Sequence, residues 1–370
     1  MNDDKPTAFK HWINQKTVKK YAQGIAGEIS FDAKNFYRAT EALETLELRD
    51  RARLLAEAFQ QLGPRDYPKV LTALWRAVEL NKIRGFELWP VSEYIQTYGH
   101  DHFDESFQAM IKLTKIFTSE FAVRPFLNRS PDATLTALTQ LIKDEDENVR
   151  RWVSEGTRPR LPWGERLPAF VKDPTRNLKL LEHLKFDASL FVRKSVANHL
   201  NDVAKDHPDI VIKTLARWQK LVPPKFEKEF AFIRHRALRT LVKAGNPAAL
   251  KLMGVQQGHP DLSVGGLKIS TPKVKLGKAL EFQFNIRNKG QKKTRFLVDY
   301  AVLHRKANGE LVPKVFKLKS GWLEPGAILN VVKSHKIKPI TTRKYYPGEQ
   351  GLEILLNGKP KAKARFTLAL

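Results

Sequence analysis

A short pattern recurs three times in the middle of the chain, and it constrains the fold more than any other feature of the sequence. The copies begin at Val149, Val192 and Ile233, and each runs apolar, basic, basic, variable before continuing with helical spacing. Their offsets of 43 and 41 residues lie within the range of HEAT and armadillo repeats. Because one such repeat cannot bury its apolar face alone, the pattern predicts a stack of helix pairs.

The second copy separates into two stripes at helical spacing. The apolar stripe, which we expect to pack against neighbouring repeats, contains Val192, Val196, Leu200 and Val203. The polar stripe contains Ser195, Asn198, Asp202 and Lys205. Equivalent polar stripes of stacked repeats align into one continuous, often concave surface. The residues expected on that surface are Arg151, Glu155, Lys194, Asn198, Asp202, Arg236, Arg239 and Lys243. Basic residues with a few carboxylates among them suggest a groove for a polyanion, with chemistry at one point.

The overall charge supports this interpretation. A net charge of +26 in 370 residues favours nucleic acid or an anionic surface as partner. The absence of cysteine excludes disulfides and thiolate metal sites and allows a reducing compartment. The histidines show no ligand spacing, so no metal and no cofactor is predicted. With no signal peptide at residues 1–4 and no apolar run of membrane-spanning length, we expect a soluble, cytoplasmic protein that does not bind membranes.

The chain changes character near residue 257. Before that point it reads as successive helix hairpins, including one helix predicted over Phe36–Leu62 and ended by Gly63 and Pro64. After it, apolar residues alternate with period two, and strands are predicted at 280–287, 295–305, 326–338, 351–356 and 362–370. About seven short strands in this length suit an immunoglobulin-like β-sandwich without its disulfide. We therefore predict a HEAT-like helical-repeat domain at 1–257 and a sandwich at 258–370.

The predicted sandwich is the more basic part of the chain. Residues 261–370 contain 23 Lys and Arg against seven Asp and Glu, a net charge of +16. A sandwich does not need this charge to fold, so we expect it to contact phosphates. The basic runs at Lys289–Arg295 and Lys333–Lys338 are expected mostly in loops, where sandwiches usually present their contacts.

A stiff loop, Arg158–Trp163, follows the first copy of the repeat. Its two prolines forbid helix and reduce its freedom, which would hold the Trp163 indole in place. An indole face attracts a cationic base or sugar and stacks on nucleotides. The alternative is that Trp163 only fills a core. Trp152 aligns with the groove or packs between repeats. The tryptophans assigned to cores are Trp12, Trp75, Trp89, Trp218 and Trp322.

Three stretches together resemble a known family. They are 149–163, 192–202 and the tail around Tyr345–Gly348 and Asn357–Gly358. They closely resemble the AlkC-type DNA alkylation-repair glycosylases, which are HEAT-like repeat enzymes related to the AlkD type and often carry an immunoglobulin-like domain. The resemblance implies removal of cationic alkylated bases, chiefly 3-methyladenine and 3-methylcytosine, from double-stranded DNA. We expect a bacterial-type monomer that works at the nucleoid.

The chemistry of that reaction fits the residues. A cationic base leaves as a neutral molecule, whereas positive charge develops on the deoxyribose and a water must attack, so carboxylates are needed. Asp202 is the first candidate because it lies on the polar stripe, and Glu155 is the second. Glu120 is supported more by the resemblance than by spacing. Arg151 is expected to clamp a phosphate or to orient Glu155. The residues expected to bind DNA are Arg150, Arg158, Arg160, Arg193, Lys194, Ser195, Asn198, Lys205, Arg236 and Arg239.

Other classes of protein remain open at this point. Helical repeats often bind proteins or nucleic acids without catalysis, so a non-catalytic nucleic-acid-binding scaffold is the main alternative. A lyase that forms a Schiff base through a lysine is a weaker one, because no lysine stands out as desolvated. An isolated Asp on a helix is also commonly a cap or a solvated surface group.

Overall fold

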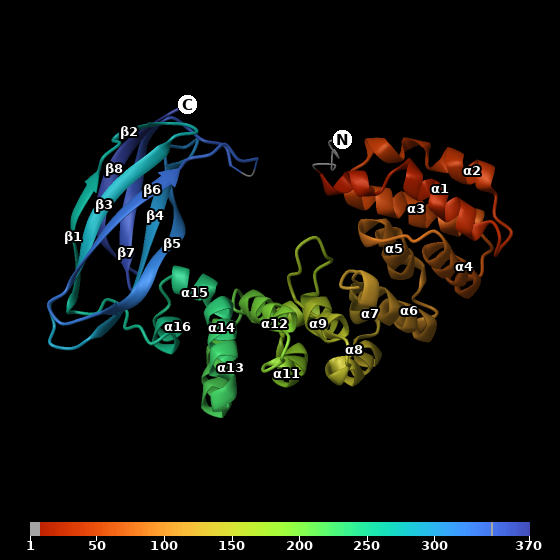
Figure 1. Ribbon diagram of the computed structural model, residues 1–370, viewed down its shortest axis with the longest axis horizontal. Coiled ribbons are helices and arrows are strands. Elements are labelled where there is room, and N and C mark those ends of the chain that lie inside the picture. The colour runs from red at the N-terminus through yellow and green to blue at the C-terminus, as the bar shows by residue number, and fades with distance from the viewer. Residues whose placement is uncertain (1–7, 342) are drawn as a thin grey trace. The chain divides into compact units, whose positions relative to one another are not determined.

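The computed structural model describes residues 8–341 and 343–370. Contacts divide the chain into two compact units, Met1–Asp206 with Lys228–Ile233 and His207–Glu227 with Arg234–Leu370. The first unit is helical, whereas the second joins further helices to two β-sheets (Figure 1).

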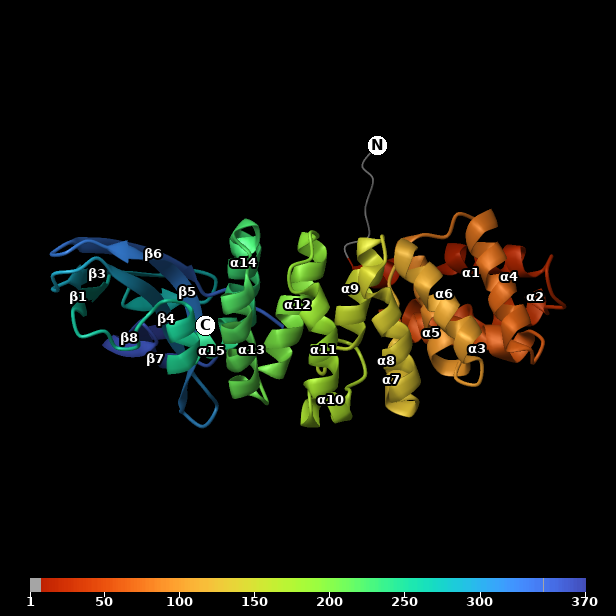
Figure 2. The same ribbon diagram turned by 90° about the horizontal axis from the view of Figure 1, so that it is seen from below.

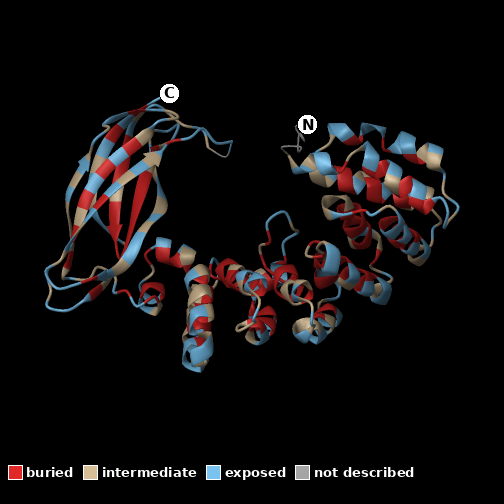
Figure 3. Cartoon of the chain, in the orientation of Figure 1, coloured by how far each residue is buried: buried red, intermediate tan, exposed pale blue. Residues whose placement is uncertain are grey.

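The first unit consists of helices that pack in series. They are η1 (Phe9–Trp12), α1 (Gln15–Ile25), α2 (Ala33–Ala39), η2 (Glu41–Thr45), α3 (Leu48–Leu62), α4 (Tyr67–Leu80), η3 (Gly85–Leu88), α5 (Trp89–Tyr98), α6 (Phe103–Ile116), α7 (Val123–Arg129), α8 (Pro131–Gln140), η4 (Leu141–Lys143), α9 (Glu147–Gly156), α10 (Pro168–Lys172), α11 (Thr175–Leu184) and α12 (Leu190–Val203). Helix α3 packs on α5 and α9 on α12 (Figure 2). Apolar faces point inward, and the predicted apolar stripe of α12 is buried (Figure 3). The predicted helical repeat is confirmed.

Helices α9 and α12 begin with the same local construction. Asp146 and Ser189 cap their first turns by accepting hydrogen bonds from the amides of Asn148 and Phe191. Arg150 Nη1 donates to the carbonyls of residues 144 and 145, at 2.8 and 2.9 Å. Arg193 Nη1 donates to the carbonyls of residues 187 and 188, both at 2.7 Å. These matching contacts show that the first two copies of the sequence pattern are structural repeats.

The single helix predicted over Phe36–Leu62 is broken into α2, η2 and α3. A buried arginine, Arg51, explains the break, because its guanidinium donates to the carbonyls of Glu44 and Leu46 at 2.7 and 2.8 Å. The same group binds the carbonyl of Ile13 at 2.7 Å. Carbonyls turned toward a buried cation leave the helical ladder, so apolar spacing alone overestimated this helix.

The second unit contains α13 (Pro208–Leu221), η5 (Pro224–Phe226), α15 (Arg239–Lys243) and α16 (Pro247–Leu252), and α14 (Glu227–Ala237) carries residues of both units. Its strands are β1 (Leu262–Ile269), β2 (Lys273–Lys275), β3 (Ala279–Asn288), β4 (Thr294–Arg305), β5 (Leu311–Leu323), β6 (Ile328–Lys336), β7 (Gly348–Leu356) and β8 (Lys359–Ala369). They form a three-stranded sheet, β1-β3-β6, and a five-stranded sheet, β2-β8-β7-β4-β5. The predicted sandwich is thereby confirmed.

Three of these strands, β1, β2 and β5, were missing from the prediction. Strand β5 lies at a sheet edge and is lysine-rich, so its alternation is weak. Lys333 and Lys336 lie within β6 and not in a loop, which corrects the expected placement of that basic run.

The β7–β8 turn packs against the helices of its own unit. Asn357 Nδ2 donates to the carbonyl of Gln256 at 2.9 Å, and Asn357 itself has a φ of 50°. A Cβ on Gly245 would lie 2.5 Å from the carbonyl oxygen of Gly358, so only glycine allows this approach. Helices α15 and α16 therefore pack with the sandwich, although the change from helix to strand occurs near the predicted boundary at 257/258.

The tryptophans divide less simply than predicted. Trp75, Trp89, Trp152 and Trp218 are buried, whereas Trp12 and Trp322 are 47% and 58% exposed. Assignment of the last two to cores was wrong. Trp12 ends a one-turn helix, and Trp322 lies on edge strand β5 with the Arg295 guanidinium 5.8 Å from its ring.

Candidate active site

The three predicted carboxylates come together in one network of the first unit. Glu155 lies in the last turn of α9 and Asp202 in the last turn of α12, while Glu120 precedes α7. Two arginines, Arg151 and Arg158, connect them. The sequence placed Glu155 and Asp202 on one polar surface, whereas Glu120 was supported more by the resemblance than by spacing.

Arg158 is the centre of this network. Its Nε donates to Asp202 Oδ2 at 2.8 Å, and its Nη1 donates to Glu155 Oε1 at 2.6 Å. Burial by itself would lower the pKa of Arg158, but the two carboxylates outweigh burial and raise the pKa. Arg158 was expected on a DNA-binding surface, whereas its guanidinium lies buried between two acids.

Arg151 extends the network to Glu120. Its Nη1 lies 2.5 Å from Glu120 Oε2, and its Nη2 lies 3.6 Å from Glu155 Oε1. Thr118 Oγ1 donates to the same Glu120 oxygen at 3.0 Å. The Arg151 guanidinium also lies 4.8 Å from the Phe191 ring. Arg151 thus lies between Glu120 and Glu155, and its role stays a prediction.

Ser195 and Asp202 do not lie on an open polar stripe, contrary to the prediction. Both residues are 2% exposed. Ser195 Oγ donates to Glu155 Oε2 at 2.6 Å, and Lys205 Nζ donates to Asp202 Oδ1 at 3.0 Å. The reason is the segment after α9, which inserts Arg158 against α12. Helical periodicity identifies a polar face but not what covers it.

The network balances its charges. Its acids are Glu120, Glu155 and Asp202, and its cations are Arg151, Arg158 and Lys205. Such pairing allows carboxylates to stay ionised away from water. Side-chain exposure rises from 3% at Asp202 to 8% at Glu155 and 13% at Glu120. Glu120 and Glu155 therefore form the open edge of the cluster, and Asp202 its buried side.

A neutral histidine lies behind the cluster. Burial lowers the pKa of His199 to about 3. Its Nδ1 lies 2.9 Å from the Ser154 carbonyl and its Nε2 lies 2.8 Å from Asn177 Nδ2, so the hydrogen is on Nδ1. His199 thus joins α9, α11 and α12 without carrying charge.

Trp163 stands at the tip of the loop after α9, and its side chain is not a core plug. The residue is 67% exposed, and its φ of 64° is a left-handed conformation that costs a non-glycine residue about 1–2 kcal/mol. The prolines do not hold this loop alone. Arg124, fully buried, donates to the Gly156 carbonyl at 2.9 Å and to the Glu165 carbonyl. Arg124 therefore ties both ends of the loop to α7.

The other residues expected to bind DNA divide into two groups. Arg150 and Arg193 bind backbone carbonyls at the start of their helices, and Arg150 also pairs with Asp187 at 2.7 Å. Arg160 pairs with Asp206 at 2.7 Å. By contrast, Lys194 and Lys205 are exposed, and Asn198 is half-buried.

Arg236 and Arg239 belong to the second unit. The third copy of the pattern does not continue as one helix, because α14 ends at Ala237 and α15 begins at Arg239. Arg239 Nη1 donates to the carbonyl of Arg236 at 2.7 Å.

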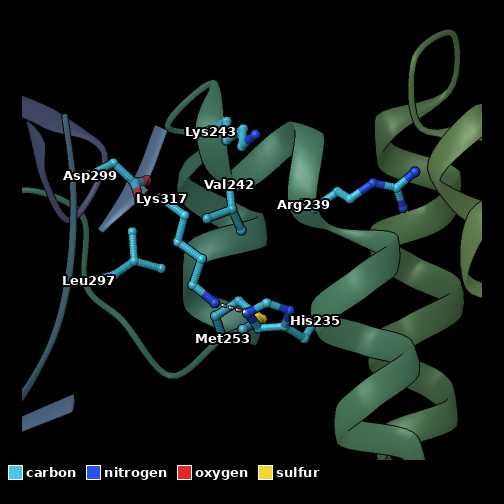
Figure 4. A pocket seen from close by; sticks show the side chains of 8 residues that line it. All are labelled: His235, Arg239, Val242, Lys243, Met253, Leu297, Asp299 and Lys317. Atoms are coloured by element: carbon cyan, nitrogen blue, oxygen red, sulfur yellow. Dashed lines mark hydrogen bonds between the residues drawn. The ribbon is translucent and has the colours of Figure 1, made fainter. Parts of the chain in front are cut away.

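A small cavity of about 50 Å³ lies in the second unit (Figure 4). Lys317 Nζ lies 2.9 Å from His235 Nε2 beside it, and Asp299 borders it from β4. Burial raises the pKa of Asp299 to about 6. Within the described part of the chain, no group of three acidic or histidine side chains could hold a metal ion, and no helix is long and apolar enough to cross a membrane.

Comparison with known proteins places this geometry in a family. A family model described as "Uncharacterised protein YhaZ, C-terminal Ig-like domain" matches residues 263–370. Uncharacterized protein YhaZ of Bacillus subtilis (strain 168) is 33% identical over 361 residues, covering 97% of this chain and 98% of that protein. The alkylpurine DNA glycosylase AlkC of Pseudomonas fluorescens, solved with DNA that contains an abasic-site analogue, is 34% identical with a TM-score of 0.90, covering 98% of this chain and all of that chain. The chain belongs to the AlkC family.

Several residues around the carboxylate cluster were not predicted from the sequence. They are Thr118, Arg124, Ser154, Asn177, Phe191 and His199. One signal was available, because His199 is a polar residue beside the apolar stripe of α12. Arg124 gave no such signal, since its partners lie more than 30 residues away in the sequence.

Proposed function

We propose that this chain is a DNA glycosylase that hydrolyses the N-glycosidic bond of cationic alkylated bases, chiefly 3-methyladenine and 3-methylcytosine. One observation supports this most. A buried, charge-paired cluster of three carboxylates lies in the same helical repeat as an exposed tryptophan, within a chain similar over its whole length to a DNA glycosylase.

The carboxylates suit the expected transition state. The leaving base is already cationic, so no general acid is required, and positive charge builds on the sugar. A carboxylate about 4 Å from a unit positive charge contributes roughly 4 kcal/mol at an effective dielectric near 20, or about three decades in rate if it acts only in the transition state. Because the cluster is fixed by its arginines, it needs no reorganisation as that charge develops.

We assign the catalytic work to Glu120, Glu155 and Asp202 as a unit. Glu120 and Glu155 face the open edge and are placed to meet the sugar and the attacking water. Asp202 neutralises the buried Arg158, so that the arginine does not repel the developing cation. Arg151 couples Glu120 to Glu155. Trp163 stacks on the damaged nucleotide.

We further propose that the basic sandwich is a second DNA-binding surface. Its exposed cations include Lys289, Lys292 and Lys293 in the β3–β4 loop and Lys336 on β6. Each phosphate that the protein neutralises makes the log–log dependence of affinity on salt steeper by about 0.9. Because α15 and α16 pack with the sandwich, point substitutions test this better than truncation.

Release of free base decides the function. Incubation of the full-length protein with methylated DNA, followed by chromatography, should yield 3-methyladenine and 3-methylcytosine with turnover and leave abasic sites. Undamaged DNA of the same sequence is the control. Tight, salt-sensitive binding without base release would instead establish the non-catalytic scaffold.

The proposed DNA contacts of the sandwich need a separate measurement. Substituting Lys289, Lys292 and Lys293 by Gln should weaken binding and make the salt slope shallower by up to about 2.7, if each lysine contacts one phosphate. A matched triple substitution of Lys273, Lys275 and Lys278, around β2, serves as control. Equal effects of the two triple substitutions would mean that the sandwich attracts DNA through its overall charge and not through these lysines.

A further inference from the structure

The tip of the tryptophan loop is held by a residue from a distant helix. Arg49, in the first turn of α3, donates from Nη1 to the carbonyl oxygen of Trp163 at 3.2 Å. The two residues are 114 positions apart in the sequence. This hydrogen bond reaches the residue with the left-handed backbone, whose indole is 67% exposed.

Arg49 is itself held by a buried acid. Its Nε donates to Glu93 Oε1 at 3.1 Å, and Glu93, on α5, is 1% exposed. Arg53 approaches the other oxygen of Glu93 at 3.8 Å. The planar guanidinium of Arg49 therefore joins a fixed carboxylate on one side to a loop carbonyl on the other, a geometry that lysine does not reproduce.

We propose that Arg49 and Glu93 form a strut that positions Trp163 for stacking on the damaged nucleotide. Arg124 fixes the two ends of the loop, whereas Arg49 fixes its tip. An uncommon backbone conformation at an exposed aromatic residue persists only where the surroundings determine it, and such residues cluster at functional sites. Arg49 is a positioning residue in this scheme, because it acts through Trp163. The inference rests on the function proposed above.

A double-mutant cycle tests the strut. Arg49→Met should lower kcat for base release by up to about thirtyfold with little change in KM, because a residue that acts only through Trp163 cannot cost more than the loss of the indole itself. In a Trp163→Ala background the same substitution should have no further effect. Equal loss in both backgrounds would overturn the proposal.

Two further variants separate the strut from a direct DNA contact. If Arg49 simply bound a phosphate, Arg49→Lys would restore activity, and Arg49→Met would make the salt slope of binding shallower by about 0.9. Under the proposal Arg49→Lys stays slow and the salt slope is unchanged. Arg53→Met is the matched control, because it removes the other arginine beside Glu93 without touching the loop. A loss equal to that of Arg49→Met would contradict the strut.

Hydrogen exchange provides a readout that does not depend on catalysis. Amides of residues 161–166 should exchange faster in Arg49→Met and Glu93→Gln than in the wild type or in Arg53→Met. If the wild-type protein releases no base, the proposed function fails, while the exchange result still decides whether Arg49 holds the loop. Unchanged exchange in both variants would overturn the strut itself.

Discussion

Helices α9 and α12 are copies of one repeat. They share the residues that hold the start of the helix and differ in the residues that form the carboxylate cluster. Arg150 and Arg193 occupy equivalent positions, and each binds two carbonyls of the turn before its helix. Other equivalent positions differ. Glu155 of α9 corresponds to Asn198 of α12, and Trp152 corresponds to Ser195.

A repeat acquires a site through the residues that differ between its copies. The arginines at the start of α9 and α12 are alike because each binds the backbone of the same turn in its own repeat. The cluster uses Glu155 from the end of α9 and Ser195 and Asp202 from α12, which are not equivalent positions. A pair of similar helices thus supplies a rigid frame, and the asymmetric residues between them supply the charge.

The largest effect is expected from a substitution at Asp202, in the carboxylate cluster. Asp202→Asn should reduce base release by about a thousandfold while DNA binding is retained, because the cluster would then carry a net positive charge beside the sugar. Single-turnover kinetics and a binding titration measure the two quantities. A loss of tenfold or less would mean that Asp202 only positions other groups.

Stability must be measured with the same variant. Removing one partner of a buried ion pair costs about 3–5 kcal/mol, so Asp202→Asn should also melt earlier. Glu120→Gln is the companion variant, since Glu120 is the more exposed acid and its loss should slow release with a smaller change in melting. Normal activity of both variants would contradict a catalytic role for Asp202 and Glu120.

Trp163→Ala should have the next largest effect on activity. The exposed indole contributes roughly 0.5–2 kcal/mol of attraction to a cationic base, so release should slow by up to about thirtyfold. The melting temperature should stay within a few degrees of the parent, because the side chain is mostly in solvent. A much earlier melt would mean that the indole also contributes to the stability of the fold.

A matched pair of substitutions tests how much the shared arginines of the two repeats contribute to stability. Arg150→Met should lower the free energy of unfolding by about 1.5–3 kcal/mol, because hydrogen bonds to Asp187 and to two carbonyls are lost. Arg193→Met should cost less, since Arg193 Nε is buried without a hydrogen-bond partner in the described residues. Denaturant titration gives both values. A specific loss of DNA affinity in either variant, with stability unchanged, would assign that arginine to phosphate binding.

The smallest expected effect is a pH dependence from His199 of α12, which contacts the Ser154 carbonyl of α9. Its folded pKa is about 3, whereas an unfolded histidine titrates near 6.5. Between these values the unfolded state binds a proton that the folded state does not, so stability should fall as pH drops below about 6.5. His199→Gln should show a shallower loss between pH 7 and pH 5. Identical slopes in both proteins would show that His199 is not buried neutral.

Local pattern sufficed for much of this protein. The recurring copies predicted stacked helices, and the apolar stripe of α12 is buried as expected. The change to period two predicted the sandwich. Asp202 and Glu155 became candidates because they lie on the polar stripes of their helices, Glu155 immediately before the proline loop. These features depend on neighbours within a few turns, which is the range that sequence periodicity covers.

Only the tertiary structure decided which charges meet. Asp202 is buried and not open because Arg158, 44 positions earlier, lies against it. Glu120 joins the cluster through Arg151, and Arg49 reaches Trp163 from a helix more than 100 residues away. Whether an ionisable residue is exposed or buried depends on a partner that offsets its desolvation, and that partner is chosen by the packing of distant segments. The spacing of residues along one helix determines its faces, but it contains no information about what covers them.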